Sequence, residues 1–143
     1  MTPRLVLDTG ALVALERGDA RAFQQLKVAA DRGFLIVVPT SVVMEALSGS
    51  QSPQRVFQVL KAIKKELPLE PAVSHEVVPL RRKAVRDSGI ETIGETDAIV
   101  VLEALAVPGS AILTDDREDV LALIAAAGAA GRVPVLTVSP VRR

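Results

Sequence analysis

Short apolar runs alternate with longer helical patterns along the whole chain, and this alternation limits the folds available to it. The strand-like runs fall at 4–7, 34–38, 67–70, 111–113 and 135–138. Leu5-Val6-Leu7 and Leu35-Ile36-Val37-Val38 contain no polar residue, which is typical of strands that are covered on both faces. The pattern therefore predicts a mainly parallel sheet with helices on both sides.

The segments between these runs have the signatures of helices. They fall at 11–16, 20–32, 40–47, 53–66, 74–88, 96–106 and 117–127. Ser52-Pro53 supplies an N-cap followed by proline at the first helical position, and Gly33 and Gly89 supply stops. We expect a three-layer α/β/α domain with a central sheet of four to five strands. With 143 residues and 49% hydrophobic composition, the chain fits a single domain over 1–143.

Composition excludes several classes of function. The absence of cysteine rules out disulfides and thiolate metal sites and agrees with a reducing compartment. The longest uncharged apolar stretch, 120–131, is too short to span a bilayer, and the first residues lead into a strand without a secretory signal. We therefore expect a cytoplasmic protein that makes no membrane contact.

The net charge gives no general attraction to nucleic acid, because 17 basic residues balance 17 acidic ones. Any such contact must come from local patches, of which the densest are Arg81-Arg82-Lys83 with Arg86, and Lys61 with Lys64 and Lys65. A solvated helix face is the preferred explanation for both patches, because surface charges on helices are usually solvated. The three aromatic residues, Phe23, Phe34 and Phe57, have spacings that suit core positions and do not predict a base-stacking surface.

Four acidic residues stand where an apolar segment ends or a helix begins: Asp8, Glu45, Asp97 and Asp116. In an open α/β sheet, ligands bind beyond the carboxyl ends of the strands, where the strand order reverses. Asp8 and Asp116 follow strand-like runs, Asp97 opens a helix, and Glu45 lies about one turn inside another. The four acids are therefore expected to converge at one end of the sheet.

A cluster of this kind needs a cation or a proton. Two carboxylates about 4 Å apart repel by roughly 4 kcal/mol at the effective dielectric of a protein surface, so either a cation binds or the pKa values rise. With no cysteine and only His75 as a nitrogen ligand, oxygen ligands favour Mg²⁺ or Mn²⁺ over zinc. Such a site supports metal-assisted attack of water on a phosphodiester.

Each acid also has an ordinary structural explanation. Asp8 is a suitable helix N-cap, and Asp97 is a suitable first-turn acid. Glu45 is harder to dismiss, because its neighbours are apolar and a carboxylate in such a setting is seldom buried without a partner. His75 is expected to have no catalytic role, since a lone histidine without positioned partners is a weak signal.

At these residues the chain resembles a PIN-domain ribonuclease, specifically a VapC-type toxin of a type II toxin–antitoxin system. The resemblance covers nearly the whole length. It is carried by four segments in order: Leu7-Asp8-Thr9-Gly10-Ala11-Leu12-Val13-Ala14-Leu15, Val38-Pro39-Thr40-Ser41-Val42-Val43-Met44-Glu45-Ala46, Thr96-Asp97-Ala98-Ile99-Val100, and Ile112-Leu113-Thr114-Asp115-Asp116-Arg117-Glu118-Asp119.

The resemblance implies an endoribonuclease that binds Mg²⁺, with Mn²⁺ as a substitute, and uses metal-activated water. It implies that the catalytic and metal-binding residues are Asp8, Glu45, Asp97 and Asp116. The family's Thr-x-Asp pattern selects Asp116, while Asp115 and Asp119 remain open as further ligands. Thr114 and Thr9 are candidates to orient the cluster through their hydroxyls. Expected partners are an RNA substrate, a cognate VapB-type antitoxin and a second copy in a homodimer.

Two other functions remain open from the sequence. The same acids would serve a structure-selective DNA nuclease, or they are caps on a non-catalytic α/β interaction module. The apolar helix face at Val56, Val59, Leu60 and Ile63 suits either a dimer contact or the internal core.

Overall fold

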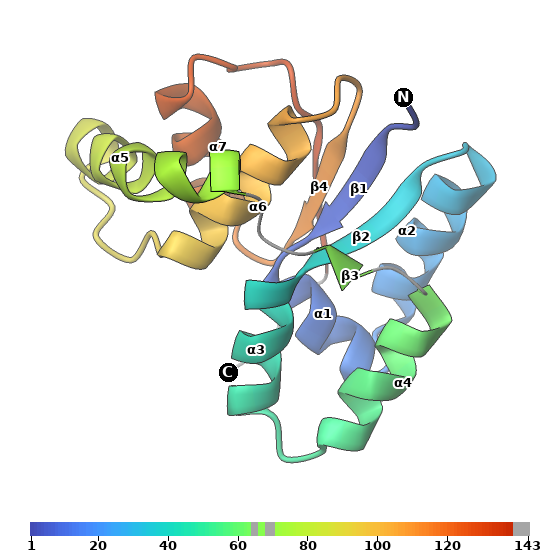
Figure 1. The fold of residues 1–143 in the computed structure, drawn as a ribbon. Coiled ribbons are helices and arrows are strands. Elements are labelled where there is room, and N and C mark those ends of the chain that lie inside the picture. The colour runs from blue at the N-terminus through green and yellow to red at the C-terminus, as the bar shows by residue number, and fades with distance from the viewer. Residues whose placement is uncertain (64–65, 68–70, 139–143) are drawn as a thin grey trace.

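The computed structural model describes residues 1–63, 66–67 and 71–138. These residues form five strands and seven helices (Figure 1). The strands are β1 (Arg4–Leu7), β2 (Leu35–Pro39), β3 (Glu66–Leu67), β4 (Ala111–Thr114) and β5 (Val135–Thr137). The helices are α1 (Thr9–Glu16), α2 (Ala20–Asp31), α3 (Thr40–Gly49), α4 (Pro53–Ile63), α5 (Pro71–Ser88), α6 (Glu95–Leu105) and α7 (Arg117–Ala126).

All five strands are parallel, in the order β3-β2-β1-β4-β5. The chain moves outward from β1 to β2 and β3, then returns to the other side of β1 for β4 and β5. The strand order therefore reverses between β1 and β4, which is where an open α/β sheet has its ligand crevice. Leu7 lies beside Leu113 in the register of these two strands, so both finish at the same level.

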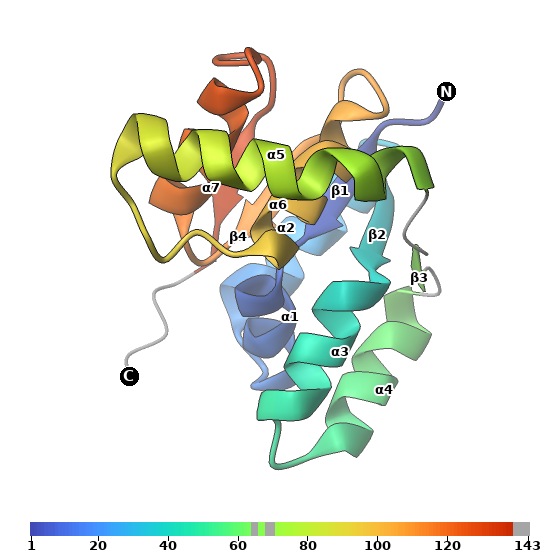
Figure 2. The same cartoon turned by 60° about the vertical axis from the view of Figure 1, so that its left-hand side comes forward.

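Helices cover both faces of the sheet, as the apolar strands predict (Figures 1 and 2). α1 and α2 pack on one face, while α6 and α7 pack on the other. α5 lies across α6 and α7, and α3 and α4 pack on α1. The predicted three-layer α/β/α architecture with a parallel sheet is confirmed.

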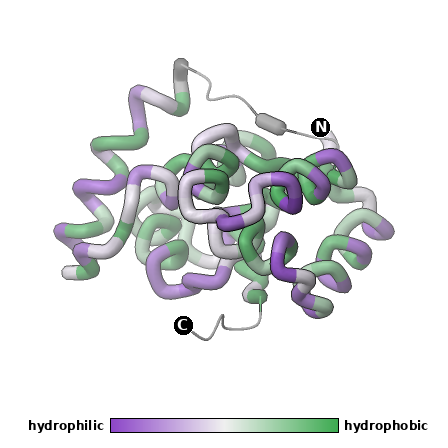
Figure 3. Tube along the Cα trace, turned by 90° about the horizontal axis from the view of Figure 1, so that it is seen from below, coloured by the Kyte–Doolittle hydropathy of each residue, from purple (hydrophilic) through white to green (hydrophobic). Residues whose placement is uncertain are grey.

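The core residues explain why these elements form. Leu5, Val6 and Leu7 of the central strand are completely buried, as are Ile112 and Leu113 of β4. Along the helices, hydrophobic and hydrophilic stretches alternate (Figure 3), because each helix buries one side and exposes the other. The face at Val56, Val59, Leu60 and Ile63 packs into this core, so the core explanation holds for these four residues.

Two expectations are wrong in detail. The helix predicted over 53–66 does not include Glu66, because Glu66 pairs with Val38 in the sheet, and this tertiary pairing overrides the local helical pattern. Phe23 and Phe57 are exposed instead of buried. Each directly follows a residue of its helix's buried stripe, and successive helical residues point about 100° apart.

Some expected features fall outside the described part of the chain. Lys64 and Lys65 lie there, as do residues 68–70 of the strand predicted over 67–70. Across the described residues, every helix falls short of the length and apolarity that a bilayer span needs.

An ion pair fixes the start of β1 to α6, the helix that carries Asp97. Arg4 Nη1 donates to Glu103 Oε2 at 3.1 Å and to the Glu103 carbonyl oxygen at 3.3 Å. Glu103 is buried. The pair therefore helps set the position of the helix beneath the predicted site.

We expect Arg4→Ala to lower the free energy of unfolding by about 3 kcal/mol, because it leaves a buried carboxylate without its cation. Chemical denaturation measures the change. Lys83→Ala is the matched control, since it breaks the exposed Lys83–Asp87 pair and should cost no more than about 1 kcal/mol. Equal effects of the two substitutions would contradict this role for Arg4.

Candidate active site

All four predicted acids line one cleft beyond the carboxyl ends of β1 and β4, with a volume of about 460 Å³. We call it the acidic cleft. Its lining residues are Asp8, Thr9, Gly10, Val13, Arg17, Glu45, Thr92, Asp97, Asp115, Asp116 and Asp119. Asp115 and Asp119, which the sequence left open, therefore lie in the cleft as well. His75 does not line it and instead lies on α5.

Asp8 is the most enclosed of these acids, with only 2% of its surface exposed. It follows β1 and is also the N-cap of α1, where its Oδ1 accepts from the Ala11 N–H at 2.8 Å. Its Oδ2 accepts from the Thr114 hydroxyl, and Thr114 Oγ1 accepts in turn from the Asp116 N–H at 2.8 Å. Thr114 thus connects two of the predicted acids, and its expected orienting role agrees with these contacts.

Asp97 and Glu45 approach from two different helices. Asp97 is the third residue of α6, and its Oδ2 accepts from the Gly94 N–H at 3.0 Å, which fixes the start of the helix. Glu45 is exposed on α3, whose buried residues are Val42, Val43 and Ala46. Its apolar neighbours therefore turn inward while Glu45 faces the open cleft, so the concern about a buried glutamate does not apply.

The start of α7 contributes the remaining acids. Asp116 caps this helix by accepting from the Asp119 N–H at 3.2 Å. Asp119 is only 5% exposed, and its oxygens accept from Thr92 Oγ1 at 3.4 and 3.5 Å. A Cβ placed on Gly10 would overlap the Asp115 carboxylate, so glycine at this position makes room for that side chain.

Three acids of the cleft, Asp8, Asp97 and Asp119, hold their protons more tightly than usual. Burial raises the pKa of Asp8 to about 7, with further contributions from the charges of Asp115 and Asp97. Burial, then the charges of Glu45 and Asp116, raises the pKa of Asp97. Burial and the neighbouring Asp116 raise the pKa of Asp119 to about 6. The cleft therefore contains more negative charge than it can stabilise alone, which favours a bound cation.

The donor atoms in the cleft fit Mg²⁺ or Mn²⁺. The carboxylates supply hard oxygen ligands, and Thr9 Oγ1 is buried without a hydrogen-bond partner in the described part of the chain. Across residues 1–63, 66–67 and 71–138, no three His, Asp or Glu side chains already stand close enough to hold one ion. A cation would have to draw the carboxylates together, and the exposure of the Glu45 side chain leaves room for such a movement.

The sequence reasoning missed Arg17, Val13 and Thr92. Thr9, Val13 and Arg17 recur at every fourth position and so share one side of α1 and its C-terminal end. Once Asp8 is taken as the helix N-cap, this spacing is enough to predict that Val13 and Arg17 lie on the same side of the helix as Thr9. Thr92 precedes α6 in a loop, and no periodic pattern marks it. Arg81, Arg82 and Arg86 do not line the cleft, although Arg81 Nε donates to the Ile93 carbonyl oxygen beside Thr92 at 2.8 Å.

Asp8→Asn should make the metal-free protein more stable above neutral pH. Because the pKa of Asp8 is about 7 in the folded state and 3.8 normally, the folded state binds the proton more tightly. The unfolding free energy should therefore fall as pH rises from about 4 to about 7 and then level off. Asparagine keeps the N-cap but does not titrate, so we expect a gain of roughly 2–4 kcal/mol at about pH 8 in chelator and little gain near pH 4.

Denaturation at both pH values measures this gain. Asp87→Asn is the matched control, because Lys83 lowers the pKa of the exposed Asp87, and its substitution should not stabilise the protein at the higher pH. A loss of stability on Asp8→Asn at about pH 8 would contradict the electrostatic description of the cleft.

Comparison with known proteins gives a match at the level of fold. No protein-family model matches the sequence, and no curated relative matches it. The structure is similar to a chain of VapBC2 from Rickettsia felis, crystallised with a DNA fragment from their promoter, with a TM-score of 0.64 and 14% identity over 94% of this chain and 98% of that chain.

A chain of FitAB bound to the IR36 DNA fragment is also similar, with a TM-score of 0.62 and 16% identity. That match covers 93% of this chain and 94% of the FitAB chain. Together with the parallel five-stranded sheet, these matches show that the chain has the PIN-like α/β/α fold of the matched chains.

Proposed function

We propose that this chain is a divalent-metal-dependent endoribonuclease that acts as the toxin of a toxin–antitoxin pair. The observation that carries the proposal is the convergence of Asp8, Glu45, Asp97 and Asp116 on one cleft at the strand-order reversal. The likeness to chains of the VapBC2 and FitAB complexes supports the toxin assignment. The proposed catalytic and metal-binding residues are these four acids.

A bound Mg²⁺ or Mn²⁺ would supply a Lewis acid that lowers the pKa of water and neutralises charge developing on a phosphate. Asp8 provides the fixed point of the site, because Ala11 and Thr114 hold both of its oxygens. Asp97 is fixed through Gly94, whereas Glu45 is exposed on α3 and can adjust to the ion. Asp119 acts as a positioning residue, since its backbone N–H orients the Asp116 carboxylate.

The partners follow from the same proposal. We propose a single domain over 1–143 that works in the cytoplasm as a homodimer and is neutralised by a small VapB-type antitoxin. The names of the similar structures support the antitoxin, because VapBC2 and FitAB are complexes of two kinds of chain. The substrate is proposed to be RNA.

Cleavage of total cellular RNA by the purified wild-type protein and Asp8→Asn tests this function. Each protein is assayed with Mg²⁺, with Mn²⁺ and with chelator, and a DNA pool is assayed in the same buffer. We expect discrete RNA fragments that require both the cation and Asp8, because the variant removes the most firmly held carboxylate. Asp87→Asn, which changes an exposed acid outside the cleft, should cleave like the wild type.

The stability measurement on Asp8→Asn separates loss of catalysis from loss of folding. Preferential cleavage of DNA would indicate that the protein is a DNA nuclease of the same fold and not a ribonuclease. No cleavage of either polymer by a folded, antitoxin-free protein would favour an interaction module whose acids are caps.

Arg82 and Arg86 are candidates to hold the RNA backbone. Both are exposed on α5, which packs on the two helices whose first turns carry Asp97 and Asp119. Replacing both with alanine should weaken RNA binding and reduce the dependence of affinity on salt, because fewer counterions are released. Binding titrations at several salt concentrations measure this, with Arg55→Ala/Arg132→Ala as a control of equal charge change. If the affinity for RNA and its dependence on salt do not change, Arg82 and Arg86 do not bind the RNA backbone.

A further inference from the structure

Helix α2 has two different stripes of side chains. One stripe packs into the core and consists of Ala22, Leu26 and Ala29. The other recurs at i, i+4, i+7 and i+11, which places its members on one side of the helix. This second stripe is Arg21, Gln25, Val28 and Arg32. It combines two cations, an amide and an exposed apolar side chain, which is not what a simple solvated helix face requires.

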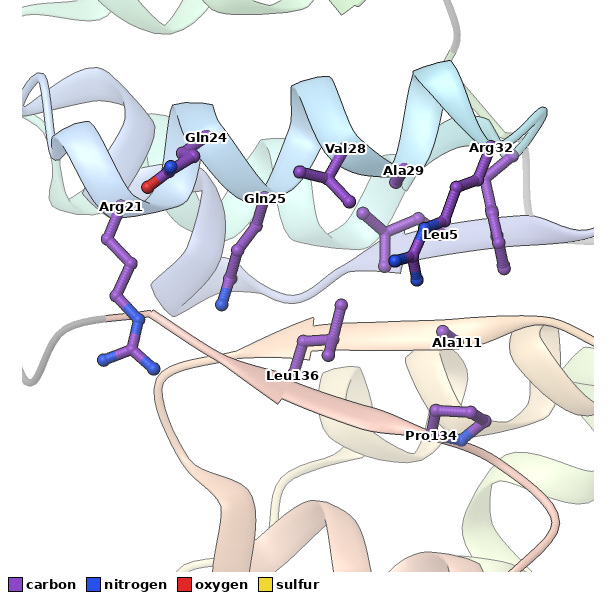
Figure 4. A pocket seen from close by; sticks show the side chains of 11 residues that line it. Leu5, Arg21, Gln24, Gln25, Val28, Ala29, Arg32, Ala111, Pro134 and Leu136 are labelled. Carbon is purple, nitrogen blue, oxygen red and sulfur yellow. The ribbon is translucent and has the colours of Figure 1, made fainter.

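The second stripe forms one wall of a cavity of about 400 Å³, which we call the α2 cavity (Figure 4). The sheet side supplies the opposite wall through Leu5, Ala111, Pro134 and Leu136. Val28 and Leu136 remain 45% and 37% exposed, although they lie on opposite sides of the same space. The volume falls within the range of about 300–1,000 Å³ that is usual for small-molecule sites.

The charge at this cavity has one sign. Arg21 and Arg32 both line it, and within the described residues no Asp or Glu does. Neither arginine forms an ion pair in the described part of the chain. In Figure 4 the Arg32 side chain turns back over the cavity toward Leu5, while Arg21 extends at the other end. A ligand with an anionic group would therefore find an unpaired guanidinium above an apolar floor.

A hydrogen bond fixes the middle of the second stripe of α2 to the sheet. Gln25 Nε2 donates to the carbonyl oxygen of Thr137, the last residue of β5, at 3.1 Å. This bond connects α2 to the strand that carries Leu136, so the cavity is bounded by two elements that are fixed to each other. The cavity is thus a formed feature of the fold.

We propose that the α2 cavity binds a small amphipathic carboxylate. The carboxylate group binds the Arg32 guanidinium, and the hydrocarbon chain lies between Val28 and Leu136. A peptide fits less well, because each of its residues brings a backbone N–H and C=O that need partners when buried. The apolar side chains of Leu5, Ala111, Pro134 and Leu136 on the sheet side offer none, whereas an alkyl chain needs none.

This site is separate from the acidic cleft and does not rest on the proposed nuclease function. Leu5 and Ala111 lie near the starts of their strands and Pro134 lies just before β5, whereas the acidic cleft lies beyond the carboxyl ends. The two sites share no lining residue in the described part of the chain.

Calorimetric titration of the full chain with octanoate, below its micellar concentration, tests the proposal. We expect saturable binding, with roughly tenfold weaker affinity for Arg32→Gln, since a hydrogen bond to a charged group is lost. Arg55→Gln is the matched control, because it removes an exposed arginine that lines a different groove, and it should bind like the wild type. Octanol, which has the same chain without the charge, should bind more weakly than octanoate.

A second variant tests where the hydrocarbon chain of the ligand lies. Val28→Asp places an anion beside the proposed hydrocarbon at an exposed position, so it should abolish octanoate binding while the melting temperature stays near that of the wild type. Absence of octanoate binding, or binding that Arg32→Gln and Val28→Asp leave unchanged, would overturn the proposal. Binding of an acidic peptide in place of octanoate would overturn it too.

Discussion

The buried carboxylate of Asp8 is the group on which the organisation of this chain depends. It ends the central strand, caps the first helix and accepts the hydroxyl of Thr114 from the neighbouring strand. A carboxylate that is 2% exposed carries a large desolvation cost, which appears as its raised pKa of about 7. The hydrogen bonds lower that cost only in part, and under the proposed function a bound cation would offset the rest.

The sheet topology brings further acidic residues close to Asp8. Because β1 and β4 are neighbours at the point where strand order reverses, the residues after them meet without obstruction by a crossover. The first turns of α6 and α7 then bring Asp97 and Asp119 to the same end of the sheet. Repulsion among these acids reduces stability, and a bound cation would restore it, as is common where function requires a locally unfavourable arrangement. The α2 cavity, near the opposite ends of the strands, is independent of this balance.

Much of this arrangement could be predicted from the sequence, because it depends on local patterns. Leu5-Val6-Leu7 followed by Asp8 identifies both a buried strand and the acid at its end. Glu45 was also placed correctly, although the exposure of its side chain could not be read from its apolar neighbours. Features that depend on tertiary contact were missed: Glu66 joins the sheet through Val38, and Arg17 reaches the cleft from the C-terminal end of α1.

Under the proposed function, the acidic cleft binds a divalent cation through its own carboxylates. Crystals grown with Mn²⁺ and measured at the manganese absorption edge test this most directly, because the anomalous signal locates the ion without assumptions about activity. We expect a peak in the cleft within about 2.5 Å of oxygens from Asp8 and Asp97, and its loss in Asp97→Asn crystals. An ordered cleft without a peak at saturating Mn²⁺, or a peak held by other residues, would contradict it.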